Sequence, residues 1–279
     1  MQIFWSKVIF AAVAAATTLV FAKNLSNRMP LNELRLNTWS IAAMDPATGD
    51  VGVALATCLP NLYADAVASL VPGKGVAVTQ ARVIIENRNR VQAALIEGLS
   101  AEAVLQRVAN SSIDPDLSQR QYGVVTLTNG QIRIAGFTGA TNGNWAGIQS
   151  DVAQAVTVQG NILVSEAVVA DALSAFLAES ADGKNLLPDR LLRALEAGSA
   201  AGGDRRCNNE STQSTAATAF VLVARGDDEP YAIARLGDTF DGADNAPWLA
   251  ISETSPLEGP NPLIELRRRY DIWRANERL

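Results

Sequence analysis

The sequence contains no histidine. This absence excludes Ser–His–Asp and Cys–His catalysis, together with every metal site that needs an imidazole ligand. Histidine is also the most frequent general base in enzymes, so acyl-transfer chemistry in this chain would need a different base. We expect no metal and no cofactor.

Positive charge is scarce as well. Lys and Arg number 23 against 29 Asp and Glu, for a net charge of −6, and the longest basic run is Arg267–Arg269. Proteins that bind nucleic acid neutralise backbone phosphates with clustered basic residues. We therefore expect no nucleic-acid partner. The expected ligand is a small molecule or a peptide, and a second copy of the chain is the other partner considered.

Only the first 22 residues contain an apolar run that approaches the length of a membrane span. Lys7 is followed by the uncharged run Val8–Ala22, which ends in Val20-Phe21-Ala22 with short side chains at the −3 and −1 positions of a signal-peptidase site. Residues 1–22 therefore read as a signal peptide. The apolar run is shorter than the roughly 20 residues of a membrane span, although a retained anchor is the alternative. We expect a secreted or periplasmic protein.

Cysteine occurs only twice, as Cys58 and Cys207. In the oxidising compartment that a signal peptide implies, an even number of cysteines favours one disulfide. A free catalytic thiol at Cys58 is the alternative, and it lacks a histidine to activate it.

Apolar spacing predicts the secondary structure. Two strands, at 38–44 and 51–57, flank the turn DPATGD, and Asn129-Gly130 is the turn of a hairpin over 121–137. Further strands are expected at 74–80, 155–161, 217–224 and 231–236. Helices are expected over 88–109, with a break near Gly98, and after Ser165, Pro188 and Asn261.

This order of elements predicts an α+β protein. Hairpins dominate, so the sheets should be mainly antiparallel, and the continuously apolar strands should be covered on both faces. A four-layer αββα sandwich satisfies both conditions, and a two-layer α+β fold is the alternative. Residues 23–37 would be an exposed lead-in, 38–255 the sandwich domain, and 256–279 a C-terminal helix docked on the core or on a neighbouring subunit.

The first hairpin brings several polar residues to one end of a sheet. If Asp45 pairs with Asp50 across the turn, Thr38 lies opposite Thr57, and a register shifted by one residue is the alternative. A Cys58–Cys207 bridge would bring the preceding segment to the same place. That segment carries an acid and two guanidinium groups, Asp204, Arg205 and Arg206.

Thr38 is the candidate nucleophile. A threonine without a neighbouring base reacts slowly, but a free α-amine has a reference pKa near 7.7–8.0 and can act as that base. This solution needs no histidine, and it requires a cut between Asn37 and Thr38. The alternative is that Thr38 is simply a β-branched residue that begins a strand.

Several motifs together resemble the family of domain of unknown function 1028, which is placed with the Ntn-hydrolase superfamily. They span roughly residues 38–225 and read TWSIAAMDPATGDVGVALATC, GKGVAVTQA, RQYGVV, GFTGA, VQGNIL and LLRALEAGSAAGGDRRC. The resemblance implies an αββα sandwich with its nucleophile at Thr38, and the two cysteines resemble a secreted branch. It also implies a shared pocket lined by Gln80, Thr138, Gln159, Asn161, Asp204 and Arg205. The family supplies no reaction.

One departure from the family concerns the start of the chain. Members that begin Met-Thr can expose the threonine by losing methionine, whereas here signal peptidase would stop near Ala22. Exposure of Thr38 would then need self-cleavage or trimming after Asn37, a residue type that tolerates strained backbone.

Two functions remain open at this stage. The first is an amide hydrolase in which Thr38 attacks and its amine is the base. Asp204 and Arg205 would orient the substrate or the amine, and Asn161 or a backbone amide would hold the oxyanion. Its substrate-binding residues would be Thr57, Gln80, Thr138, Gln159 and Arg206. The second is a non-catalytic envelope protein that binds a small ligand, a cell-wall fragment or a protein. In that case Asp204, Arg205 and Arg206 form a salt-bridged loop, and Gln159-Gly160-Asn161 is a polar turn.

Overall fold

The computed structural model describes residues 34–36, 38–62, 64–179, 185–208, 210–230 and 247–277. The expected signal peptide, most of the lead-in and the strand expected at 231–236 lie outside this part of the chain. Its strands are β1 (Leu34–Leu36), β2 (Thr38–Met44), β3 (Val51–Thr57), β4 (Ala68–Val71), β5 (Gly75–Val83), β6 (Arg120–Thr128), β7 (Gln131–Thr138), β8 (Trp145–Asp151), β9 (Val156–Leu163), β10 (Thr218–Ala224) and β11 (Leu249–Thr254). Its α-helices are α2 (Ile85–Ile96), α3 (Ala101–Gln106), α4 (Ala167–Leu177), α5 (Leu187–Ala200) and α6 (Pro262–Asn276).

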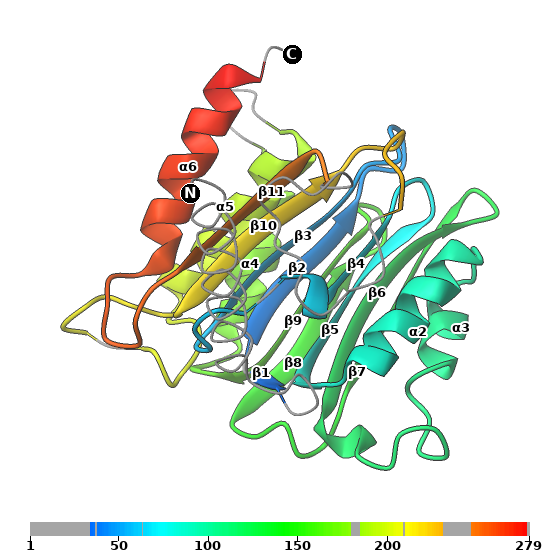
Figure 1. Cartoon of the computed structure of the whole chain (residues 1–279), viewed down its shortest axis with the longest axis horizontal. Helices are drawn as coiled ribbons and strands as arrows, with labels where there is room; N and C mark the ends of the chain where they lie inside the picture. The colour runs from blue at the N-terminus through cyan, green and yellow to red at the C-terminus, as the bar shows by residue number, and fades with distance from the viewer. Residues whose placement is uncertain are drawn as a thin grey trace, which may run out of the picture.

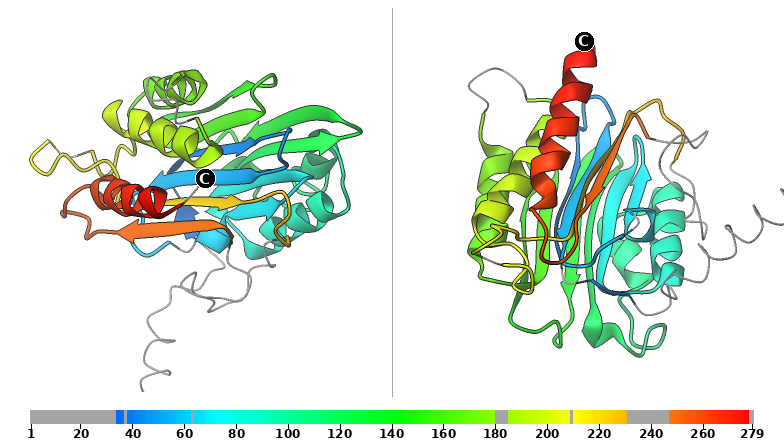
Figure 2. Two further views of the ribbon diagram at one scale, coloured as in Figure 1. Left: turned by 90° about the horizontal axis from the view of Figure 1, so that it is seen from above. Right: turned by 60° about the vertical axis from the view of Figure 1, so that its left-hand side comes forward.

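The elements form four layers (Figures 1 and 2). Among the described residues, β1, β4, β5, β6 and β7 make a five-stranded sheet, and the other strands make a six-stranded sheet in the order β11-β10-β3-β2-β9-β8. All described pairings are antiparallel. One buried apolar cluster lies between the sheets, another under α4, α5 and α6, and a third under α2 and α3. The predicted αββα sandwich is confirmed, and the two-layer alternative is wrong.

The β2–β3 hairpin has the register that its turn predicts. The backbone N–H of Asp45 donates to the carbonyl of Asp50 at 2.8 Å, and the pairing then runs without a bulge to Thr38 opposite Thr57. Pro46 and Gly49 fall within this turn, and Gly49 has a φ of +82° that favours glycine. A local turn therefore fixes which residues of β2 face the other sheet.

A large side chain in β2 anchors the six-stranded sheet to α5. Trp39 is fully buried and donates its indole N–H to the carbonyl of Leu195 at 3.2 Å. A Cβ on Gly198 would lie 2.6 Å from the indole nitrogen, and a Cβ on Gly203 would lie 2.8 Å from the ring. The glycines in the segment that ends α5 therefore leave the space that Trp39 fills.

Some elements were not expected from the sequence. Strand β4 has only four residues, and polar residues interrupt β8 and β11, so the apolar pattern does not mark them. In addition, Leu34–Leu36 of the expected lead-in pair with β5 as strand β1. The lead-in therefore contributes to the five-stranded sheet.

The C-terminal helix packs on the six-stranded sheet beside α5. Asn261 caps α6 by accepting from the N–H of Leu263, as the Asn-Pro start predicts. The Tyr270 hydroxyl donates to Asp189 at 2.6 Å, and Arg267 donates twice to Glu196, also at 2.6 Å. In the described part of the chain no helix is both long and apolar enough to span a membrane.

Candidate functional site

Thr38 opens β2 on the face that looks toward the other sheet. Side chains alternate along a strand, and Trp39 points to α5, so Thr38 and Ser40 point between the sheets. Thr38 has an exposed fraction of 0%, and among the described residues its Oγ1 has no hydrogen-bond partner. A buried hydroxyl in this state costs about 1–3 kcal/mol, so the hydroxyl of Thr38 does not itself stabilise the fold.

A set of uncharged polar side chains fills the space between the sheets at this end. Ser40 donates to Gln80 Oε1 of β5 and accepts from Gln159 Nε2 of β9, both at 2.6 Å. The Gln159 Nε2 also donates to the backbone carbonyl of Ser40 at 3.2 Å. The Ser40–Gln80 bond connects the two sheets directly, and the Gln159 bonds join neighbouring strands of the six-stranded sheet.

Gln121 of β6 joins the remaining members. Its Oε1 accepts from Gln80 Nε2 at 2.7 Å and from Asn161 Nδ2 at 3.0 Å, and its Nε2 donates to Thr138 Oγ1 at 2.9 Å and to the Gly160 carbonyl at 2.8 Å. We call the set the amide layer, and its members are Ser40, Gln80, Gln121, Gln159 and Asn161. All five are at least 99% buried.

Local backbone features make room for the amide layer. A Cβ on Gly123 would lie 2.0 Å from Gln159 Oε1, so only glycine allows Gln159 to pack across the gap. In addition, Gln80 and Asn161 are each followed by a non-glycine residue with positive φ, Ala81 at +69° and Ile162 at +52°. For a β-branched residue such as Ile162 this is a strained conformation. Strain of this kind concentrates at functional sites.

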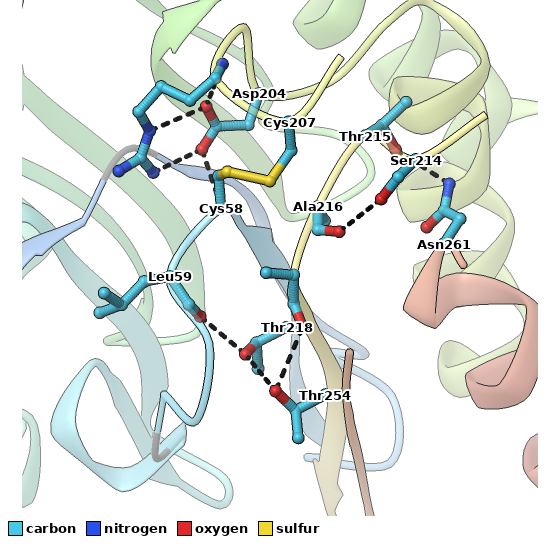
Figure 3. Close-up of a disulfide and its surroundings, with 12 residues drawn as sticks. Cys58, Leu59, Asp204, Cys207, Ser214, Thr215, Ala216, Thr218, Thr254 and Asn261 are labelled. Atoms are coloured by element: carbon cyan, nitrogen blue, oxygen red, sulfur yellow. Dashed lines mark hydrogen bonds and ion pairs between the residues drawn. A yellow bond between two sulfur atoms is a disulfide. The ribbon is translucent and has the colours of Figure 1, made fainter. Parts of the chain in front are cut away.

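The predicted disulfide lies at the same end of the sheet (Figure 3). Cys58 and Cys207 are bonded, with their Cα atoms 5.5 Å apart, so the free-thiol alternative is wrong. The Asp204 carboxylate is buried beside the bridge, and its Oδ2 accepts from the N–H of Cys58 at 2.9 Å. Arg206 holds both carboxylate oxygens through its guanidinium and donates its own backbone N–H. Asp204 therefore fixes the end of β3 next to Thr57.

Arg205 lies on the rim of this region. Its backbone N–H donates to the carbonyl of Ile162 at 3.2 Å, which ties the disulfide loop to β9 one residue after Asn161. The Arg205 side chain is exposed. A guanidinium in this position is free to meet a carboxylate from solution, because such pairs form bidentate hydrogen bonds.

The structure thus brings most of the predicted site residues to one end of the sandwich. Gln80, Gln159 and Asn161 belong to the amide layer, and Thr138 borders it. Thr57 lies beside Thr38 in the adjacent strand. Asp204, Arg205 and Arg206 are joined to the ends of β3 and β9 by the contacts above. Their roles in catalysis or binding stay predictions.

Two members of the amide layer were missed from the sequence, Ser40 and Gln121. Ser40 had a signal, since it lies two residues after Thr38 and so shares its face of the strand. Gln121 had no such signal. It is a single polar residue near the start of a hairpin strand, and its role depends on contacts with other strands that the sequence does not show.

Side chains of the amide layer carry no titratable group. Among the described residues, no group of three or more carboxylates or cysteines could hold a metal ion. The buried ionisable groups with shifted pKa values lie elsewhere, some on α5 and α6 and others on the α2 side of the five-stranded sheet. Asp114 belongs to the α2 side. Burial raises the pKa of Asp114, but hydrogen bonds and charge from Arg120 outweigh it and leave that pKa below its usual value.

Comparison with known proteins identifies the family. The model of a family of unknown function, DUF1028, matches residues 38–242. The chain belongs to this family. The match begins at Thr38 and extends further than the roughly 38–225 that the motifs indicated.

A crystal structure supports the fold. Protein SPO2555 from Silicibacter pomeroyi, also of DUF1028, is similar with a TM-score of 0.62 and 23% sequence identity, over 85% of this chain and 88% of that chain. No curated protein matches. The comparisons therefore give the family and the fold, and they assign no reaction.

Proposed function

We propose that the protein is a secreted amide hydrolase of the N-terminal-nucleophile type, with Thr38 as nucleophile after processing. The observation that carries the proposal is the fully buried Thr38 hydroxyl, unpartnered among the described residues, at the start of β2 beside the amide layer. The lack of histidine supports an amine as base. The Cys58–Cys207 disulfide supports an oxidising compartment, to which residues 1–22 would direct the chain.

The chemistry begins with hydrolysis of the Asn37–Thr38 bond, which frees the α-amine of Thr38. The Oγ1 atom then attacks the carbonyl carbon of a substrate amide while its proton passes to that amine. The amine gives the proton to the departing nitrogen, the C–N bond breaks, and an ester on Thr38 remains. Water hydrolyses the ester in a second step, and the acid leaves with Thr38 restored.

Side chains of the amide layer would bind and polarise the substrate. Asn161 Nδ2 donates one N–H to Gln121 Oε1. We assign its second N–H as a donor to the oxyanion. Gln80 and Gln159 hold the layer in place, and Thr57 flanks Thr38. Because Asp204 is fully engaged by Cys58 and Arg206, we assign it a positioning role, and we assign Arg205 to a carboxylate of the substrate.

The first test is the N-terminal residue of the mature secreted protein. We expect Thr38. A terminus at Lys23 that persists on incubation would leave the amine in a peptide bond and overturn the proposal.

Substitution of the nucleophile gives the second test. Thr38→Ala should abolish hydrolysis of amide substrates and leave the protein folded, whereas Thr38→Ser, which keeps the hydroxyl and the amine, should retain part of the activity. Thr79→Ala is a matched control, because Thr79 is equally buried but faces the opposite side of its sheet. Turnover by Thr38→Ala at the wild-type rate would contradict the assignment.

One observation favours the second candidate, a non-catalytic ligand-binding protein. The amide layer is already fully connected across the two sheets, as a rigid recognition surface would be. That function predicts an intact Asn37–Thr38 bond and a Thr38→Ala variant that binds its ligand normally.

A further inference from the structure

Strand β1 occupies an edge that the other described residues leave free. One side of β5 pairs with β6. On its other side, β4 pairs with Gly75–Val78 and the carbonyl of Val67 accepts from the N–H of Thr79. The pairing beyond that point is made by β1 alone among the described residues, with Leu36 opposite Ala81 and Leu34 opposite Val83.

The N–H groups of Ala81 and Val83 face away from β6. The N–H of Thr79 points to the free edge, and backbone direction alternates along the extended residues from there to the N–H of Ala81. Ala81 has a φ of +69°, so the alternation does not carry past it. Beyond Ala81, the side chain of Arg120 donates to the carbonyl of Arg82 at 2.6 Å, and the N–H of Val83 points the opposite way because the peptide between them is planar and trans. An extended peptide can pair with these two N–H groups, as β1 does.

This edge leads directly to the proposed nucleophile. Leu36 pairs with β5 in one sheet, and Thr38 begins β2 in the other, so a single residue joins them. A residue of extended chain spans about 3.3–3.6 Å. Any peptide that pairs with β5 as β1 does would bring the carbonyl of its next residue to Thr38. Gln80, the neighbour of Ala81, belongs to the amide layer at the same point.

We infer that the edge of β5 at Ala81–Val83 is the binding site for the acyl side of an extended peptide substrate, and that β1 occupies it in the uncleaved chain. This inference rests on the proposed function and adds the substrate class. Recognition is through the main chain, so it tolerates different side chains. The uncharged amide layer favours a neutral residue at the bond that is cleaved.

The test uses two variants of the full chain in a Thr38→Ala background. Leu34→Pro with Leu36→Pro removes the two backbone N–H groups that pair with β5, and Leu34→Ala with Leu36→Ala keeps them. The probe is a fluorescent Leu-Arg-Leu-Asn peptide with blocked ends. Amide exchange at Ala81 and Val83 is measured together with fluorescence anisotropy.

We expect exchange about tenfold faster or more in the proline variant than in the alanine variant. Saturable binding of the peptide should then restore the protection, and a peptide N-methylated at both leucines should not bind. Equal exchange in the two variants, or no binding to an exposed edge, would overturn the inference. If the proline variant does not fold, a Leu34→Cys/Val83→Cys chain replaces it. Failure of that chain to form the cross-link would contradict the pairing.

These outcomes separate the inference from the proposed function. Peptide binding needs no reactive Thr38, so binding without hydrolysis in the Thr38-containing chain would reject the hydrolase and keep the peptide site. Hydrolysis of small amides without peptide binding would reject the peptide site and keep the hydrolase.

Discussion

Two buried polar clusters on opposite faces of the five-stranded sheet differ in kind. The amide layer faces the other sheet and is uncharged. The second, which we call the ion-pair cluster, lies under α2 and consists of Asn87, Asp114, Arg120 and Tyr122. Its carboxylate accepts from Arg120 at 2.7 and 3.0 Å and from Asn87 at 2.8 Å.

The two clusters differ in how their buried polar atoms are paired. In the ion-pair cluster no side-chain polar atom is buried without a partner, and the charges are matched. Beside the amide layer, the Thr38 hydroxyl is buried without one, and two strained residues flank the site. Natural proteins tolerate such costs where function requires them.

The largest loss of stability is expected when the ion-pair cluster is broken. Asp114→Asn should lower the free energy of unfolding by about 3–5 kcal/mol, because it leaves Arg120 buried without its counter-charge. Asp116→Asn is the control, since Asp116 is 49% exposed and its 3.4 Å pair with Arg82 should contribute about 1 kcal/mol or less. Chemical denaturation measures both, and equal losses would contradict the contrast.

Acid should weaken the same cluster. The folded-state pKa of Asp114 is lowered, since hydrogen bonds and charge from Arg120 outweigh the effect of burial. Its contribution is therefore present above the unfolded pKa of about 3.9 and is lost as the pH falls through the folded pKa. The stability difference between wild type and Asp114→Asn should shrink below about pH 4. A constant difference in urea titrations across that range would exclude this linkage.

An intermediate effect is expected inside the amide layer. Gln121→Leu removes the acceptor of both Gln80 and Asn161, so it should cost about 2–3 kcal/mol of stability. Gln131→Leu changes an exposed glutamine in the adjacent strand and should stay within about 0.5 kcal/mol of wild type. If both variants unfold at the same denaturant concentration, the layer is not the inter-sheet connection that its contacts indicate.

The smallest change in stability is expected when the hydroxyl of Thr38 is removed. Thr38→Val removes an unpartnered polar atom at nearly constant volume, so stability should be unchanged or higher by about 1 kcal/mol. Thr157→Val should cost about 1 kcal/mol, because its hydroxyl bonds Ser150 and Gln159 at 3.0 and 3.2 Å. A clear loss of stability in Thr38→Val would mean that the hydroxyl has a structural partner.

Local signals made much of the fold predictable. The turn at 45–50 fixes the β2–β3 register, Asn129-Gly130 marks the β6–β7 hairpin, and Ser100 and Asn261 cap helices as expected. Strands β4, β8 and β11 have no comparable local mark. They are defined by the strands beside them, which a single sequence does not reveal.

The site was predictable to the extent that it depends on that one hairpin. The Thr38–Thr57 pairing and the Cys58–Cys207 bridge follow from a turn and a cysteine count, and they bring Asp204 to the end of β3. The link from Ser40 to Gln121 runs through Gln80 across the two sheets. No spacing along the chain encodes such a contact.

The Cys58–Cys207 bridge makes a covalent ring of more than half the protein. The two cysteines are 149 residues apart, so β4 to β9 and α2 to α5 lie within the ring, and β2, β10, β11 and α6 lie on the chains that leave it. A single cut by a protease anywhere between the cysteines cannot release a fragment. In an extracellular setting the two pieces of such a nicked molecule would stay linked, with only the mass of one water added, until a reductant separated them.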